Sequence, residues 1–154
     1  MAKAFTFRVE PVLKVRQQTE RLALQRLADA QRQVSEVEDA IAGLRGQLAD
    51  QDRLVRQGVL TGSVDVNYMS LYRRHVMALH RRMIEQAHRL HEATVRLAAR
   101  REEAAAAMKQ RKVLQTLKDK LKARYLDDLE RTEARTQDDL TLMRVGHQRI
   151  EEDA

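Results

Sequence analysis

Apolar residues recur every three or four positions over most of the chain, and this spacing constrains the fold more than any other feature. Between residues 27 and 55 it is the heptad repeat of a coiled coil, with eight of nine inward positions apolar. These positions are Leu27, Ala30, Val34, Val37, Ile41, Leu44, Leu48, Gln51 and Val55. Extending the register backward gives Leu13, Arg16, Glu20 and Ala23, so we expect a weaker or shifted seam there.

A second apolar repeat follows. Its inward positions are Tyr72, Val76, Leu79, Met83, Ala87, Leu90, Thr94, Leu97, Ala104 and Met108. Beyond Met108 the apolar residues continue mostly at a spacing of four, as Leu114, Leu117, Leu121, Tyr125 and Leu129. This change of spacing predicts a phase slip near the alanine run at residues 104–107.

Proline and glycine mark the ends of the two repeats. Pro11 suits the first turn of a helix, and Gly58 and Gly62 indicate a loop. We predict a first helix at about 11–57, a loop at about 58–63, and a second helix at about 64–145, with Gly146 as a stop. The predicted fold is all-α: two long helices form an antiparallel coiled-coil hairpin, helix 2 is longer than helix 1, and residues 1–154 form a single domain.

Composition points to a narrow core and away from catalysis. Of the 154 residues, 3% are aromatic and 34% are charged, and there is no cysteine. His88 and His91 share a helix face without enough further ligands, and a two-helix rod offers no deep pocket. We therefore expect no metal site, no cofactor and no enzyme activity. The first 20 residues lack the apolar stretch of a signal peptide and no segment could span a bilayer, so we expect a cytoplasmic protein without membrane insertion.

Charge is unevenly distributed along the second helix. The net charge is +6, residues 109–124 are strongly basic, and residues 125–154 are predominantly acidic. A basic helix can contact phosphates, so a nucleic-acid-binding coiled coil is one alternative function. No recognisable set of base-reading side chains accompanies it, and we expect no nucleic-acid partner.

The chain opens with an extended pattern, in which Phe5, Phe7 and Val9 alternate with polar residues. Pairing the two helices outward from the loop places Val12 opposite about Lys109. The helix beyond about Lys112 then overhangs, unless the N-terminal residues pair with it. Its apolar stripe would lack an intramolecular partner, which is typical of an interaction surface.

The opening residues FTFRVEPVLKVR resemble the start of the flagellar FliJ family, whose members commonly begin with a phenylalanine, a basic residue and a run like Leu-Glu-Pro-Val-Leu. The resemblance implies a cytoplasmic component of the flagellar type III protein export apparatus, peripheral at the inner face of the cell membrane. FliJ-like proteins look like the central stalk of rotary ATPases. The resemblance implies that the chain inserts in the hexameric export ATPase, promotes its assembly and activity, and links it to the export gate, in support of flagellum biogenesis and motility.

Two sets of contact residues follow as hypotheses. The residues expected to face the ATPase ring are Phe5, Phe7, Val9, Val12, Leu13, Leu117, Leu121, Tyr125 and Leu129. The residues expected to contact the cytoplasmic domain of the export gate are Tyr72, Val76, His80 and Met83. Export chaperones are a further partner left open, and the second alternative function is a chaperone-like or structural rod that holds export substrates.

Overall fold

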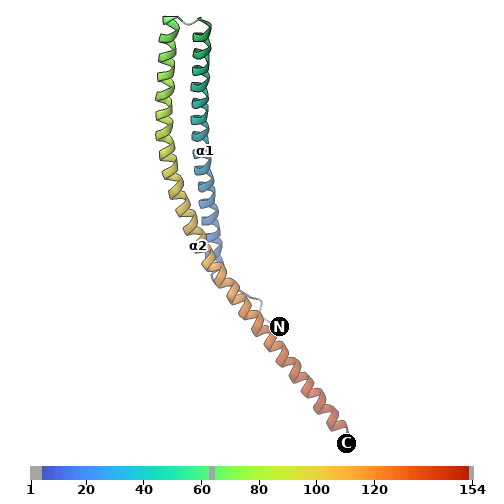
Figure 1. Cartoon of the computed structure of the whole chain (residues 1–154). Helices are drawn as coiled ribbons and strands as arrows, with labels where there is room; N and C mark the ends of the chain where they lie inside the picture. The colour runs from blue at the N-terminus through green and yellow to red at the C-terminus, as the bar shows by residue number, and fades with distance from the viewer. Residues whose placement is uncertain (1–4, 63–64, 153–154) are drawn as a thin grey trace. The chain divides into compact units, whose positions relative to one another are not determined.

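The computed structural model describes the backbone of residues 5–62 and 65–152 and the side chains up to residue 144. This part of the chain contains two helices, α1 (Glu10–Thr61, 52 residues) and α2 (Val66–Glu152, 87 residues), and no strand. The prediction of an all-α fold, in which a longer second helix packs against the first, is confirmed (Figure 1).

Contacts between residues group the chain into two compact units. Residues Thr19–Ala107 form one unit, here called the hairpin unit, in which α1 and α2 lie side by side on either side of the turn (Figure 1). Met1–Gln18 and Met108–Ala154 form the other, here called the tag unit. That the whole chain is a single domain stays a prediction.

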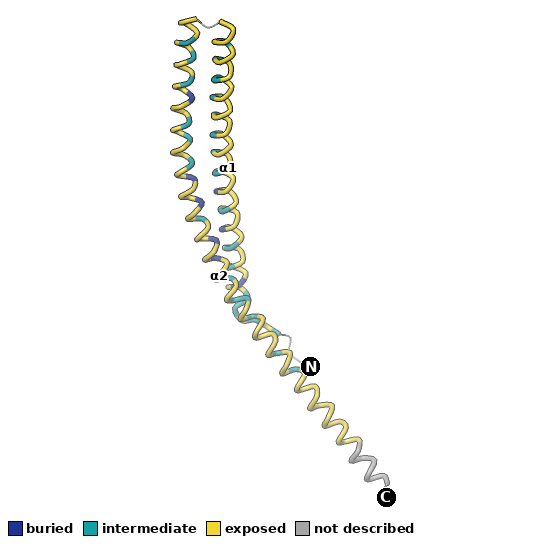
Figure 2. Tube along the Cα trace, viewed as in Figure 1, coloured by how far each residue is buried: buried dark blue, intermediate teal, exposed yellow. Residues whose placement is uncertain are grey.

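The residues that α1 buries follow one unbroken heptad register. Leu13 is 1% exposed, Ala23 and Ala30 are also buried, and Arg16 and Glu20 are half-buried. Of the two alternatives expected before Leu27, a weaker seam or a shifted one, the register shows no shift, and the seam is more polar there. Arg16 and Glu20 hold seam positions because long polar side chains can cover the seam with their methylene groups while their polar ends reach its edge. In the hairpin unit, the buried and half-buried residues line the facing sides of the helices (Figure 2).

The phase slip predicted in α2 does not occur. Ala104 and Ala107 are buried, Arg111, Leu114 and Lys118 follow as half-buried residues, and Met108 is 45% exposed. The register passes through the alanine run without a change. Four consecutive alanines carry no contrast in size to show which of them faces the seam, so the larger Met108 is wrongly expected there. Ala87 and Thr94, also expected on the seam, are exposed, and Gln86 and Ala93 take their places. In the hairpin unit, Ala23, Ala104 and Ala107 form a buried cluster against which Leu27 packs.

Both helices are longer than predicted. Gly58 is helical, and α1 continues to Thr61. The next residue, Gly62, has a left-handed backbone conformation with a φ of 70°. Its N–H donates a hydrogen bond to the Val59 carbonyl at 3.3 Å. Glycine accommodates this conformation at a helix end without a steric cost. The helix α2 continues past Gly146 to Glu152, rather than ending near residue 145.

The start of α2 is set by a side-chain cap. The Asp65 carboxylate accepts a hydrogen bond from the Tyr68 backbone N–H at 2.7 Å, and the Asp65 carbonyl accepts one from the Met69 N–H at 3.1 Å. This is the geometry of an N-cap residue, which satisfies donors that have no partner within the helix. The predicted start at Val64 and the predicted loop end at Ser63 fall outside the described residues.

The corrected register makes a direct prediction about stability. We expect Ala107→Glu to lower the free energy of unfolding by about 1–3 kcal/mol, because it forces a charged side chain into the seam. Met108→Glu places the same side chain on an exposed position and should change the free energy by less than about 0.5 kcal/mol. Urea unfolding followed by circular dichroism measures both, and equal effects would contradict the register.

Candidate functional site

The residues ahead of α1, here called the tag (Phe5–Val9), alternate in burial as the sequence predicts. Phe5, Phe7 and Val9 are half-buried, whereas Thr6 and Arg8 are exposed. The backbone then enters α1, where the Glu10 N–H donates to the Phe7 carbonyl and the Leu13 N–H to the Val9 carbonyl, both at 3.0 Å. Pro11 follows in the first helical turn, where its lack of an N–H leaves no bond unmade.

The tag lies against α2 within the tag unit. The rings of Phe5 and Tyr125 are tilted by 47°, with their centroids 5.7 Å apart. Such an aromatic pair is worth about 0.5–1.5 kcal/mol beyond the area it buries. Near the helix start, the Lys118 ammonium forms an ion pair with the Glu10 carboxylate at 2.7 Å. Both side chains are partly exposed, so this pair adds at most about 1 kcal/mol.

These contacts correct the expected pairing of the two helices. The Arg16 guanidinium donates to the Gln110 side-chain oxygen at 2.7 Å, and Glu10 meets Lys118, so each residue faces a later part of α2 than the sequence suggested. The shift arises because α1 ends at Thr61 instead of about residue 57 and α2 begins at Val66 instead of about residue 64, so the turn is centred later in the sequence than predicted. The part of α2 beyond the start of α1 therefore begins after Lys118 and not at about Lys112.

An apolar groove forms where the tag meets α2. Leu117 and Leu121 remain 44% and 37% exposed, so they are partly covered and partly open to a partner. The expectation that the stripe along α2 has no intramolecular partner is therefore wrong over this stretch. The residues that line the groove are Phe5, Thr6, Phe7, Arg8, Val9, Leu117, Leu121 and Tyr125.

Six of the nine residues expected to face the ATPase ring thus meet in one groove, and three do not line it. Leu13 is 1% exposed and belongs to the core. Val12 is 46% exposed on α1, and Leu129 is half-buried on α2. Sequence spacing alone could not separate Leu13 from its neighbours, because a core leucine and a binding leucine have the same residue type.

The four residues expected to contact the gate do not form one exposed surface. Tyr72, Val76 and Met83 are half-buried at seam positions of α2. His80 is exposed, and its Nδ1 lies 2.8 Å from the Val76 carbonyl oxygen. A partner could reach His80 without disturbing the hairpin, whereas replacing any of the other three also alters the packing of the seam.

Sequence reasoning missed a second groove on α2 that shares Leu117 with the first. It is lined by Val113, which is 68% exposed, and by three lysines. The sequence does show that these lining residues recur three, four and seven positions apart, a spacing that places them on one face of a helix. The lining residues are Lys109, Lys112, Val113, Thr116, Leu117 and Lys120.

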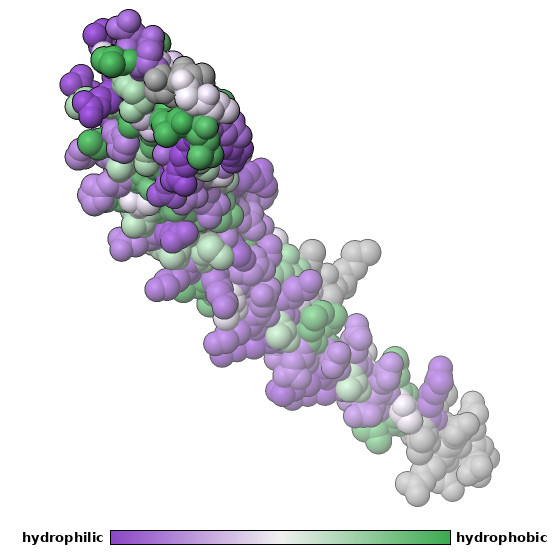
Figure 3. Space-filling view, turned by 45° about the horizontal axis from the view of Figure 1, so that its top comes forward, coloured by the Kyte–Doolittle hydropathy of each residue, from purple (hydrophilic) through white to green (hydrophobic). Residues whose placement is uncertain are grey.

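The remaining surface is mostly polar. Figure 3 shows hydrophilic residues over most of the visible face, with smaller hydrophobic patches between them. Within the described residues, no cluster of three or more histidine, aspartate or glutamate side chains could hold a metal ion. Neither helix, over its described length, has an apolar stretch long enough to cross a bilayer.

Anchoring of the tag by its aromatic contact is testable. We expect Tyr125→Ala to increase the rate of trypsin cleavage after Arg8 about two- to tenfold, because loss of the aromatic pair raises the population in which the tag is detached. Mass spectrometry of the released N-terminal peptide gives the rate. Tyr68→Ala, in the hairpin unit, is the control, and an unchanged rate for Tyr125→Ala would contradict the contact.

Comparison with known proteins identifies the family of this chain. No match was found among curated proteins or among solved structures. The family described as "Flagellar FliJ protein" matches residues 5–149, beginning at the first residue of the tag. The match covers nearly the whole chain, and the chain therefore belongs to the FliJ family, whose members are components of the flagellar protein export apparatus.

Proposed function

We propose that this protein is a central-stalk-like coiled coil of the export apparatus, which inserts in the hexameric export ATPase and promotes its assembly and activity. The observation that carries the proposal is the groove in which tag residues and α2 residues form one apolar surface. A stalk needs such an apolar surface, because a contact with a ring must bury enough area to offset the loss of rotational freedom.

Charge around the groove suits a partner with acidic residues. Arg8 lines the groove itself, and Lys109, Lys112 and Lys120 rim the neighbouring one. Basic residues at the edge of an apolar patch steer association and fix orientation more than they add affinity. Val12, Leu13 and Leu129 take no part in the groove, so we propose that the other six residues make the ring contact.

Contact with the gate is the second part of the proposal. His80 is the exposed member of the four residues expected to bind the gate, and it lies in the hairpin unit, separate from the groove residues of the tag unit. A protein that contacts the ATPase and the gate through different units can link them. We propose that this link holds the protein at the inner face of the membrane, without insertion into the bilayer.

The rate of ATP hydrolysis by the purified export ATPase, measured across a titration of this protein, tests the proposal. We expect stimulation together with hexamer formation. Binding without any change in rate or oligomeric state would instead favour the chaperone-like rod.

Replacing two groove residues makes the test specific. We expect the double variant Leu117→Ser and Leu121→Ser to need at least about a tenfold higher concentration for half-maximal stimulation of hydrolysis. The reason is that two apolar anchors are removed from the interface. Circular dichroism should stay nearly unchanged, since both positions are partly exposed. The matched control replaces Leu54 and Leu71, which are 52% and 66% exposed, by serine. Full stimulation by the groove variant would refute the assignment.

The gate contact has its own variant. We expect His80→Ala to weaken capture by the cytoplasmic domain of the gate about threefold or more, without a change in thermal stability, because this side chain lies outside the seam. His88→Ala, also exposed on α2, serves as the control. If the gate domain captures the His80→Ala variant as well as the unchanged protein, His80 does not belong to the surface that contacts the gate.

A further inference from the structure

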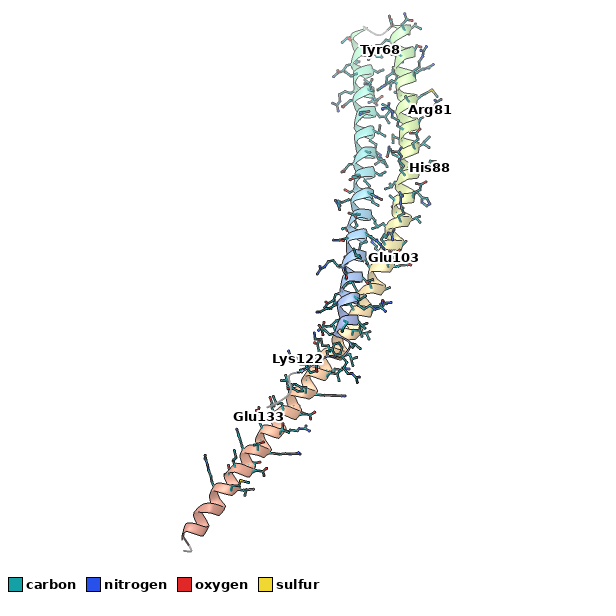
Figure 4. All side chains as sticks on the ribbon, turned by 180° about the vertical axis from the view of Figure 1, so that it is seen from behind. Tyr68, Arg81, His88, Glu103, Lys122 and Glu133 are labelled. Atoms are coloured by element: carbon teal, nitrogen blue, oxygen red, sulfur yellow. The ribbon has the colours of Figure 1, made fainter. Side chains whose placement is uncertain are left out.

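A second heptad row runs along α2 in the hairpin unit, on the face that does not pack against α1. It contains three apolar residues, one arginine and two histidines, and all are exposed; Met77, Ile84 and Val95 are 62%, 60% and 57% exposed. Figure 4 shows Arg81 and His88 on the side of α2 that is turned away from α1. The members of this row, here called the α2 outer face, are Met77, Arg81, Ile84, His88, His91 and Val95.

The arginines of this region have no partner in the hairpin. Arg81, together with Arg82 and Arg89 beside the row, forms no ion pair with any residue that the structure describes. Exposed apolar side chains between unpaired cations are more typical of a protein interface than of a phosphate-binding helix, because phosphates would leave Met77 and Ile84 without an apolar partner.

A row that consists mostly of small residues runs along the outer side of α1. Gly46 belongs to this row, and Gly43 lies beside it. A Cβ atom added at Gly43 or Gly46 would meet nothing within 4 Å, so packing in the hairpin does not require glycine at either position. Each glycine costs about 0.5–1 kcal/mol relative to alanine inside a helix. The members of this row, here called the α1 outer face, are Arg32, Ser35, Asp39, Ala42, Gly46 and Ala49.

Acidic side chains lie next to these small residues. Glu36, Glu38 and Asp39 are exposed and form no ion pair within the described part of the chain. The α1 outer face therefore combines a shallow, small-residue surface with unpaired carboxylates. The α2 outer face combines protruding apolar residues with unpaired cations, so the two faces are complementary in both shape and charge.

The two faces also match in position along the hairpin. Gln51 shares a surface pocket with Tyr72, and Ala23 packs in one cluster with Ala104. Interpolating between these contacts at about 1.5 Å per residue places Ile84 at roughly the level of Ala42, and Arg89 at roughly the level of Asp39. Two hairpins that lie side by side and point the same way would bring these residues together.

We propose that hairpins of this protein associate laterally, with the α2 outer face of one copy packed on the α1 outer face of a second copy. Ile84 packs over Ala42, Gly43 and Gly46, and Arg89 approaches the carboxylates of Glu36 and Asp39. The α2 outer face does not pair with itself, because like charges would meet. Since each copy uses two different faces, the contact is heterologous and can extend beyond a dimer or close into a ring.

The natural chain has no cysteine, which makes cross-linking an unambiguous test. The full-length variants Ala42→Cys and Ile84→Cys are mixed, one of them carrying a mass tag, and treated with a short bismaleimide. We expect the mixed pair to cross-link at least about fivefold more than either variant alone, because residue 42 faces residue 84 of the other copy and not itself. The control pairs Ile84→Cys with Gln25→Cys, on the same side of α1 but at another level.

Charge reversal and sedimentation supply the second readout. We expect Arg89→Glu and Asp39→Arg each to lower the association constant about three- to tenfold, and an equal mixture of the two to recover part of the loss. The proposal is overturned if the wild-type protein sediments as a monomer at all concentrations. It is equally overturned if residue 84 cross-links mainly to itself, or if the α2 outer face binds a short DNA duplex or anionic vesicles while the hairpins stay monomeric.

Discussion

The seam between α1 and α2 is the constraint on which the rest of the structure depends. Its residues recur at alternating steps of three and four positions, from Leu13 to Gly58 on α1 and from Met69 to Lys118 on α2. A chain that is one-third charged and poor in aromatic residues has little else to bury, so the seam supplies nearly all of the apolar contact. Alanines at Ala23, Ala104 and Ala107 let the helices approach closely where larger residues would hold them apart.

The tag extends this coverage where α1 can no longer provide it. Residues 5–7 precede a turn at residues 8–9, which the hydrogen bond from the Glu10 N–H to the Phe7 carbonyl closes. Phe5, Phe7 and Val9 are half-buried, whereas Thr6 and Arg8 are exposed. Because the tag covers Leu117 and Leu121 only in part, it builds a groove instead of closing the surface.

Much of this could be predicted from the sequence, since hydrophobic periodicity is a direct consequence of helix geometry. The two helices, their relative lengths and the alternation of apolar residues in the tag follow from the spacing of apolar residues, whereas the contact between the tag and α2 was only an alternative to an uncovered stripe. The register near Met108 could not be predicted, because alanines carry no contrast in size. The helix ends were also missed, because a helical glycine such as Gly58 and a terminating glycine such as Gly62 differ only in backbone conformation.

The residue types of the groove could be listed from the sequence, but which leucines are covered could not. Leu13 lies on the seam and is 1% exposed, whereas Leu117 lies beside the seam position Lys118 and is 44% exposed. A spacing of three or four residues fits both leucines, so only the register in the structure separates them. The same argument explains why three of the four expected gate residues lie in the seam, since aromatic and aliphatic residues at this spacing are needed by the hairpin itself.

The tag lies folded along α2, so that both contribute to one surface. The most direct measurement is the distance distribution between spin labels at Arg8 and Lys122, both exposed and both within the tag unit. A single narrow distribution at short distance is predicted for the free protein. A broad distribution extending to long distances, as expected of an unattached segment, would contradict the account.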